Sequence, residues 1–211
     1  MGIFGKKKNV GGSDAEKVVS EAAVEKPKIV VIFGTIGSGK SVQGQLLAAR
    51  NGWRWLSAGQ LLRDANDSDI TKVQHSGVLV DDKIVNRVLK RALTKAEKEV
   101  SGVIVDGYPR TAEQTNWLIE NGFLPDLAIL LDVPQNEIKK RLRIRGRGDD
   151  VSEESLENRF RVFESGTSEI RKILRGNGVH FVEVDGNATV GNVHDSVMKK
   201  VEKYIFNALK S

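Results

Sequence analysis

The segment Gly34-Thr-Ile-Gly-Ser-Gly-Lys-Ser41 decides the fold of this chain, because it matches the phosphate-binding pattern G-x-x-x-x-G-K-[ST] at every fixed position. An apolar run over residues 28–33 precedes it and predicts a buried strand, while residues 40–50 have the pattern of a helix. In that order, the N–H groups of the loop and the helix N-terminus face a phosphate chain. Lys40 can then reach the β- and γ-phosphates, and the Ser41 hydroxyl can ligate Mg²⁺. The segment predicts binding of a nucleoside triphosphate.

The bulk composition bounds the remaining possibilities. A length of 211 residues fits one α/β domain, and the absence of cysteine excludes disulfides and thiolate metal sites. No apolar run approaches the ~20 residues of a membrane-spanning helix, and the start has no secretory signal. We therefore expect a cytoplasmic protein without stable membrane association.

The net charge of +5 could indicate nucleic-acid binding or arginines that hold polyphosphate. The sequence has no zinc-finger spacing, no RNP aromatic pattern and no coiled-coil basic region. We therefore expect the arginines to serve bound nucleotides, with no nucleic-acid partner.

Residues 1–26 differ from the rest, with three lysines at 6–8 followed by Gly-Gly-Ser and a polar segment that has little to bury. They predict a flexible N-terminal leader. Met1-Gly2 does not indicate N-myristoylation, because Lys6 stands where that motif requires Ser or Thr.

Residues 27–211 form a single predicted domain in which strands and helices alternate. This alternation predicts right-handed βαβ crossovers and a parallel sheet covered on both faces. We expect strands at 28–33, 53–56, 102–106, 127–133 and 179–184, and helices near 40–50, 58–65, 82–94, 111–121, 134–145, 152–174 and 189–209.

A second motif, Val103-Ile-Val-Asp-Gly-Tyr-Pro-Arg110, places an acid at the end of a buried strand and an arginine after a rigid turn. Asp106 is expected to hold Mg²⁺, through water, since this ion prefers oxygen ligands and retains its own waters. The alternative is an aspartate that caps a turn or helix. Arg110 could clamp a phosphate with two hydrogen bonds.

Together these motifs resemble the adenylate kinase family of nucleoside monophosphate kinases. The resemblance is carried by Gly37-Ser-Gly-Lys40, by Leu56-Ser-Ala-Gly-Gln-Leu-Leu-Arg63, by Asp106-Gly-Tyr-Pro-Arg-Thr111 and by the arginines from Arg141 to Arg159, and it is colinear from about residue 28 to about residue 201. It implies a P-loop NTPase fold with a five-stranded parallel sheet flanked by helices. It also implies an acceptor-binding segment at about 57–86 and a very short lid at about 145–150.

The implied activity is reversible phosphoryl transfer from Mg-ATP to a nucleoside monophosphate, with AMP as the expected acceptor and Mg²⁺ as cofactor. The implied catalytic residues are Lys40, Arg110, Arg147 and Arg159. The implied ATP contacts are Gly34, Gly37, Ser38, Gly39, Lys40, Ser41, Val42, Arg141, Arg145 and Ala188. The implied acceptor contacts are Ala58, Gly59, Arg63, Val78, Leu79, Val80, Gly107, Arg110 and Gln114, where Gln114 stands at the position that contacts the adenine of AMP.

The arginines also have an independent rationale. Phosphoryl transfer between two polyphosphates needs positioning and positive charge more than covalent chemistry. The alternative for Arg141, Arg143, Arg145 and Arg147 is a solvated basic helix end that the helix dipole favours.

The chain also departs from the family pattern. Ile36 replaces a usual Pro, Ser41-Val42 replaces Gly-Thr, and Gln60 replaces an acid. Ala58 resembles the residue that UMP/CMP kinases carry at this position, whereas Thr111 and Gln114 resemble the adenylate kinase pattern. We therefore expect AMP as the acceptor, with a UMP/CMP kinase as the alternative. Since a stunted lid excludes water less completely, we also expect some ATP hydrolysis without acceptor.

Two further functions compete with this interpretation. A nucleotide sensor without catalysis is expected to lose acceptor-side or lid arginines, yet Arg63, Arg110, Arg147 and Arg159 are all present. A small-metabolite kinase is disfavoured by the segments 57–63 and 107–110. We expect a monomer, no catalytic histidine, and a packing role for Trp53 and Trp55.

Overall fold

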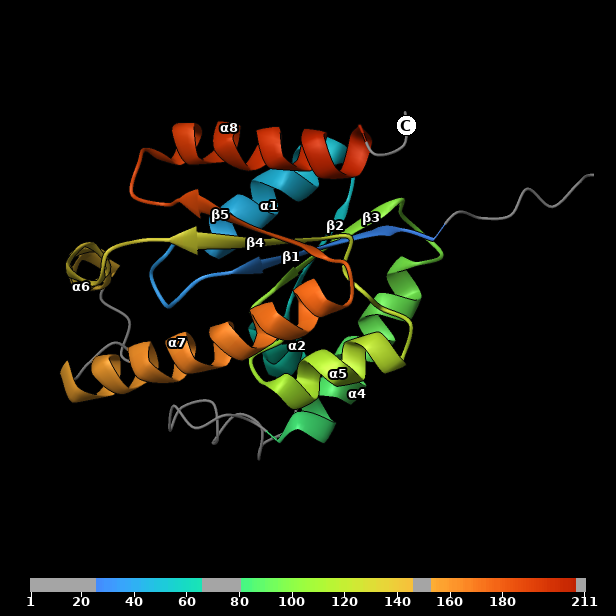
Figure 1. Ribbon diagram of the computed structural model, residues 1–211, viewed down its shortest axis with the longest axis horizontal. Coiled ribbons are helices and arrows are strands. Elements are labelled where there is room, and N and C mark those ends of the chain that lie inside the picture. The colour runs from blue at the N-terminus through green and yellow to red at the C-terminus, as the bar shows by residue number, and fades with distance from the viewer. Residues whose placement is uncertain (1–25, 66–80, 146–152, 208–211) are drawn as a thin grey trace, which may run out of the picture.

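Five parallel strands form the centre of the computed structural model, which describes residues 26–65, 81–145 and 153–207 (Figure 1). The strands are β1 (Lys28–Phe33), β2 (Arg54–Ser57), β3 (Gly102–Asp106), β4 (Leu127–Asp132) and β5 (His180–Asp185). Their order across the sheet is β2-β3-β1-β4-β5, and every neighbouring pair is parallel. The expected five-stranded parallel sheet is confirmed.

Helices cover both faces of this sheet, and each face has its own apolar core (Figure 1). One face is covered by α1 (Lys40–Asn51), α8 (Val190–Val201) and a π-helical turn, η1 (Glu202–Phe206). The other face is covered by α2 (Ala58–Asp64), α4 (Asp82–Ala96), α5 (Ala112–Glu120) and α7 (Glu153–Gly176). Because both faces are buried, β1, β3 and β4 are almost continuous apolar runs.

The remaining helix, α6 (Gln135–Arg145), follows β4 at the carboxyl edge of the sheet. Ile138 and Leu142 of α6 are buried with Leu156 and Phe160 of α7 in a small separate cluster. Ile36 of the phosphate loop packs against this cluster. The loop between β1 and α1 therefore packs against α6 and α7.

The observed elements differ from the expected ones mainly at their ends. In place of the expected helix 189–209, the structure has α8 followed by the wider π-helical turn η1. Residues 1–25 of the expected leader, 66–80 of the expected acceptor segment and 146–150 of the expected lid lie outside the described residues. None of the helices in the described ranges is long and apolar enough to cross a bilayer.

Trp53 and Trp55 pack in the interior, as expected. Trp53 is 9% exposed and its ring centroid lies 5.8 Å from that of Phe206 in η1. A Cβ atom at Gly102 would overlap the Trp53 indole, and one at Gly44 would lie 2.9 Å from Trp55. Small residues on β3 and α1 thus make room for the two indoles, of which Trp53 is buried and Trp55 is half-buried.

Candidate active site

The residues singled out by the two sequence motifs gather at the carboxyl edge of the sheet. β1 lies at its centre, with β3 and β2 on one side and β4 and β5 on the other. The loop after β1 therefore lies between the turn after β3 and the loop that follows β5. In open parallel sheets, ligands bind outside the carboxyl ends of the strands where the strand order reverses direction.

The phosphate loop has the backbone geometry that an anion site requires. Gly37 and Gly39 have φ angles of 78° and 92°, in the left-handed region that favours glycine. Gly39 is the N-cap of α1 and no side chain caps the helix, so the first N–H groups of α1 remain open to a bound anion. The Lys40 ammonium donates to the Thr35 carbonyl at 3.3 Å, across the same loop.

Ser41 and Asp106 lie together beneath this loop, because β1 and β3 pair with Ile32 opposite Asp106. The Ser41 hydroxyl donates to Asp106 Oδ2 at 2.6 Å. Asp106 is 2% exposed, and its other oxygen, Oδ1, is buried without a hydrogen-bond partner among the described residues. An unsatisfied buried carboxylate oxygen beside a hydroxyl is a donor set that suits a hydrated Mg²⁺ ion.

Ser38 lies in the interior of the loop. It is 2% exposed, and within the described chain its buried hydroxyl has no hydrogen-bond partner. A Cβ atom at Gly34 would overlap the Ser38 hydroxyl, so glycine is required for this close approach. Val42 lies on the first turn of α1 and is 47% exposed.

The turn after β3 positions Arg110. Its Nε donates to the Gly107 carbonyl at 2.8 Å, and Gly107 has a φ of 76°. Although the Arg110 side chain is open to solvent, surrounding protein lowers its pKa through desolvation, while Asp106 raises it and Arg159 lowers it further. Arginine stays protonated in proteins, so the consequence is a cation that feels both the buried carboxylate and the half-buried Arg159 of α7.

Gln114 is 2% exposed and both ends of its amide are engaged. Its Oε1 accepts from the Arg110 N–H at 2.7 Å, and its Nε2 donates to Asp82 Oδ1 at 2.6 Å. The Thr111 hydroxyl donates to the other Asp82 oxygen at 3.0 Å and caps α5 through the Gln114 N–H. Asp82 therefore ties the start of α4 to the start of α5.

Tyr108 adds a second tie between these two helices. Its hydroxyl donates to Asn86 Oδ1 at 2.5 Å and to the Gln114 carbonyl at 3.1 Å. Burial, and secondly the nearby Asp82 carboxylate, raise the pKa of Tyr108 well above its ordinary value. The hydroxyl thus stays protonated and acts as a structural donor.

The described part of the acceptor-binding segment follows β2. Ser57 caps α2 by accepting from the Gln60 N–H, and Ala58 is 5% exposed. Arg63 is exposed, and its Nη2 donates to Gln60 Oε1 at 2.7 Å. The side chain of Gln60 therefore positions the guanidinium, and Gly59 next to it carries no side chain that would block access.

On the other side of β1, Arg141 links α6 to the loop after β5. Its Nη2 donates to the Gly186 carbonyl at 3.0 Å, and the Gly186 N–H donates to the Asp132 carbonyl at 2.7 Å. Ala188 is exposed in the same loop. Arg141 thus has a structural contact at this edge, in addition to the nucleotide contact that the resemblance implies.

Several predicted site residues cannot be placed. Arg147 and the stretch Val78-Leu-Val80 lie outside the described residues, and Arg145 is described only as the last residue of α6. Their predicted roles stay predictions. Within the described ranges, no group of three His, Asp or Glu side chains forms a metal cage, so a metal here would take most ligands from water and substrate.

Two residues of this site were not foreseen. Asp82 gave no sequence signal, because its partners lie about 30 residues further along the chain. Gly166 lies inside α7, where a Cβ atom would come within 2.9 Å of the Arg110 carbonyl. A glycine within a long amphipathic helix is a recognisable signal of close backbone approach.

Comparison with known proteins gives a consistent result. A family model described as Adenylate kinase matches residues 32–178, more than half of the chain. The chain is 32% identical over 177 residues to an adenylate kinase of Prochlorococcus marinus (strain MIT 9515), an alignment that covers 78% of this chain and 95% of the relative. It is 30% identical over 187 residues to an adenylate kinase of Bacteroides fragilis (82% and 97%) and 32% identical over 183 residues to one of Nocardia farcinica (81% and 97%).

Proposed function

The chain belongs to the adenylate kinase family of nucleoside monophosphate kinases, and we propose that it transfers the γ-phosphoryl group of Mg-ATP to AMP, giving two molecules of ADP. The observation that carries this proposal is the meeting of the phosphate loop with the turn after β3. Ser41 contacts Asp106 at 2.6 Å, and Arg110 follows four residues after Asp106 in the same turn. This arrangement gathers cations and a metal-binding carboxylate around one point.

The chain's own residues act by positioning and by charge. Lys40 holds the β- and γ-phosphates of ATP, and Arg110 and Arg159 approach the transferred group from the β3 turn and from α7. Arg147 is proposed to join them from the lid. Such fixed cations stabilise the charge that spreads over the equatorial oxygens during transfer and need no reorganisation at the moment of reaction.

Ser41 and Asp106 are the residues that would hold Mg²⁺, and the unpartnered Asp106 Oδ1 supports this assignment. When bound, the ion supplies neutralisation of the β- and γ-phosphate oxygens. The buried position of Asp106 keeps its carboxylate from turning away into solvent.

Acceptor identity is the finer part of the proposal. Gln114 favours AMP, but its amide contacts Asp82 and Arg110 in this structure. Contact with an acceptor base therefore requires Gln114 to exchange one of these hydrogen bonds. Ala58 is the residue that favours UMP or CMP instead. Because Gln114 also holds the Arg110 backbone, a Gln114 variant would confuse specificity with catalysis, and the unaltered protein is the better test.

The test is a coupled assay of the purified protein with Mg-ATP and AMP, CMP, UMP, dAMP or GMP in parallel. Arg110→Ala serves as the inactive variant, and Arg91→Ala, an exposed arginine on α4, is its matched control. Preferred turnover of AMP supports the proposal, while preference for UMP or CMP would overturn AMP as acceptor. ATP binding without turnover of any acceptor would instead indicate a nucleotide sensor.

A further inference from the structure

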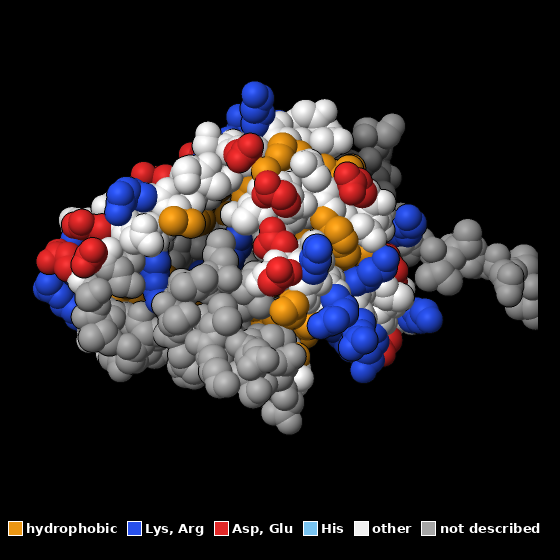
Figure 2. Space-filling view, turned by 90° about the horizontal axis from the view of Figure 1, so that it is seen from below, with side chains coloured by type: hydrophobic (Ala, Val, Ile, Leu, Met, Phe, Trp, Pro, Cys, Tyr) orange, Lys and Arg blue, Asp and Glu red, His pale blue; other side chains and the backbone are white. Residues whose placement is uncertain are grey.

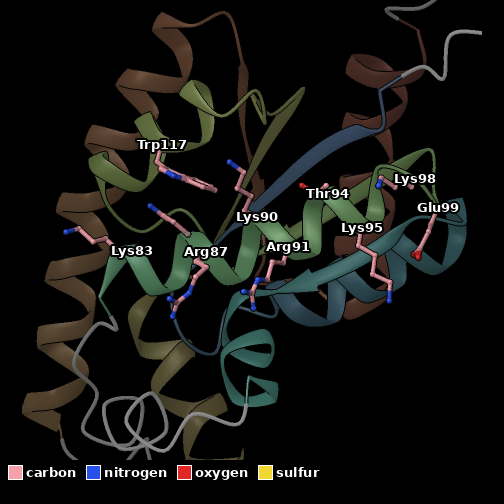
Figure 3. A pocket seen from close by; sticks show the side chains of 10 residues that line it. Lys83, Arg87, Lys90, Arg91, Thr94, Lys95, Lys98, Glu99 and Trp117 are labelled. Carbon is pink, nitrogen blue, oxygen red and sulfur yellow. The ribbon is translucent and has the colours of Figure 1, made fainter.

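The outer face of α4 carries a row of cations that the phosphotransfer site does not use. Figure 3 shows them along the length of the helix, and they line a hollow of about 860 Å³ with Trp117 of α5 at its side. On α4 itself, the 12 residue steps from Lys83 to Lys95 span about 18 Å at 1.5 Å per residue. We call this surface the basic face, and it consists of Lys83, Arg87, Lys90, Arg91 and Lys95 on α4 and of Lys98 in the turn just after the helix.

These cations are not neutralised by the protein. All six are exposed, and within the part of the chain that the structure describes none has a carboxylate oxygen within 4.0 Å. Cations on other elements do have such partners, as in the pairs Lys139–Glu153 at 2.8 Å and Arg171–Glu183 at 2.6 Å. The space-filling view from below shows Lys and Arg side chains gathered together on this side of the molecule (Figure 2).

Apart from Lys90, whose Nζ donates to Asn121 Oδ1 at 2.9 Å, the cations are not required by the fold. α4 is held by its opposite face, where Val85, Leu89, Leu93 and Ala96 are buried. Arg87 and Arg91 are four residues apart, as are Arg91 and Lys95, and like charges at this spacing destabilise a helix by about 0.2–0.5 kcal/mol per pair. The cations therefore cost helix stability without contributing to the core.

Most of the basic face lies away from the nucleotide crevice, although its first residue, Lys83, adjoins Asp82 at the edge of the site. Its far end lies at Glu99, which pairs with Arg54, the first residue of β2. The crevice lies at the other end of β2, beyond Ser57. From the sequence alone we expected the arginines to serve bound nucleotides, whereas the structure places Lys95 and Lys98 near the end of β2 that lies away from the crevice.

The side chain of Trp117 indicates which class of partner the basic face can bind. It is half-buried, packs against Phe123 with ring centroids 6.3 Å apart, and still lines the hollow beside the cations (Figure 3). An indole fixed by such packing offers a preformed surface on which a nucleobase can stack. A flat bilayer fits less well, because the apolar residues of α4 are buried in the core and cannot insert into lipid.

We propose that the basic face of α4, together with Trp117, binds single-stranded nucleic acid. The cations track the phosphate backbone, and Trp117 stacks on a base, without selection of sequence. At about 3.4 Å per stacked nucleotide, a row of about 18 Å accommodates roughly five nucleotides.

The test measures fluorescence anisotropy of a labelled single-stranded RNA of about twelve nucleotides with the full chain at several salt concentrations. Lys90→Glu/Lys95→Glu is compared with Lys172→Glu/Lys199→Glu, which reverses two exposed lysines on α7 and α8. The slope of log affinity against log salt should become shallower by about 1.4 in the first pair, since each neutralised phosphate contributes about 0.7. The control pair should retain the original slope, and both should retain phosphotransfer activity and thermal stability.

Trp117→Leu tests stacking separately, and we expect RNA affinity to fall by about tenfold at constant salt. The proposal is overturned if both lysine pairs change the slope equally, or if inorganic polyphosphate with the same number of phosphates binds as tightly as RNA. Binding of phosphatidylserine-containing vesicles in place of RNA would overturn it too, by assigning the basic face to a membrane. Thermal melting of Trp117→Leu confirms that the variant is folded, and Trp117→Phe, which keeps an aromatic ring, should retain most of the affinity.

Discussion

At the scale of single residues, the contact between Ser41 and Asp106 matters most, because it joins the two sequence motifs. The Asp106 carboxylate is 2% exposed, and one of its oxygens accepts a hydrogen bond from the Ser41 hydroxyl. Its second oxygen has no hydrogen-bond partner among the described residues. A buried polar atom without a partner costs stability, and such atoms are retained at sites with a function. We infer that this oxygen serves the metal site.

Asp106→Asn is expected to reduce phosphoryl transfer by about 10–100-fold and to raise the Mg²⁺ concentration needed for half-maximal rate, because the amide offers a weaker ligand environment. A Mg²⁺ titration of the initial rate measures both effects. Asp132→Asn is the matched control, since Asp132 also ends a central strand but has an exposed side chain. Equal Mg²⁺ dependence in the two variants would contradict the assignment.

A second residue-scale prediction concerns His194 on α8, whose Nδ1 lies 3.3 Å from Gln43 Oε1. Burial, and secondly the Arg50 cation, lower the pKa of His194 below its ordinary 6.5, while Asp195 opposes this. The unfolded chain therefore binds a proton more readily than the folded one, so stability is fully present above pH 6.5 and falls as the pH drops toward the native pKa. The His194→Gln variant should lack this loss of stability at low pH, and thermal melts between pH 7.5 and 5.5 measure the difference. If the melting temperatures of both proteins fall equally with pH, the prediction is wrong.

At the scale of elements, α7 and the β3 turn are held at a separation that only glycine permits. A Cβ atom at Gly166 would lie 2.9 Å from the Arg110 carbonyl, which is backbone and cannot swing away. The same helix carries Arg159, so the approach of α7 sets the distance between two of the proposed phosphate-binding cations. α4 and α5 are similarly tied, through Asp82 and Tyr108.

Gly166→Ala is therefore expected to slow turnover by about ten- to a hundredfold, since small displacements of positioned groups carry large kinetic penalties. Gly176→Ala in the same helix is the control, because a Cβ atom there meets nothing within 4 Å. The control should be neutral or slightly stabilising, as alanine favours helix over glycine. Steady-state kinetics and thermal melts of the two variants separate the outcomes, and a fully active Gly166→Ala would show that the contact does not position Arg110.

At the scale of the whole molecule, one central sheet separates two apolar cores, and the C-terminal turn η1 closes one of them. Trp53 links this turn to the sheet through Phe206 and the space above Gly102. Trp53→Ala should lower the free energy of unfolding by about 3–5 kcal/mol. Leu46→Ala, at a residue 39% exposed, should change it by about 0.5 kcal/mol or less, as urea denaturation would measure. Comparable losses in the two variants would contradict a sealing role for Trp53.

Features formed by residues close together in the sequence could be predicted, whereas contacts between distant segments could not. The bounds of β1 and β3 were predicted correctly, because strands buried on both faces are continuous apolar runs. The phosphate loop was predicted correctly as well, because the spacing of its glycines and Lys40 in the sequence determines the conformation of the loop. The link from Asp82 to Gln114 was not, because it depends on how α4 packs against α5. The end of the last helix was placed too late, because periodicity does not distinguish an α-helix from the π turn over 202–206.

The central position of β1 also has a stereochemical consequence. The proposed donor and acceptor groups lie on opposite sides of the strand that carries the phosphate loop, so two nucleotides bound as proposed would present their phosphate chains end to end above it. A single in-line displacement would then transfer the phosphoryl group directly from one nucleotide to the other, with one inversion of configuration at phosphorus. ATP made chiral at its γ-phosphorus should accordingly yield a product of inverted configuration.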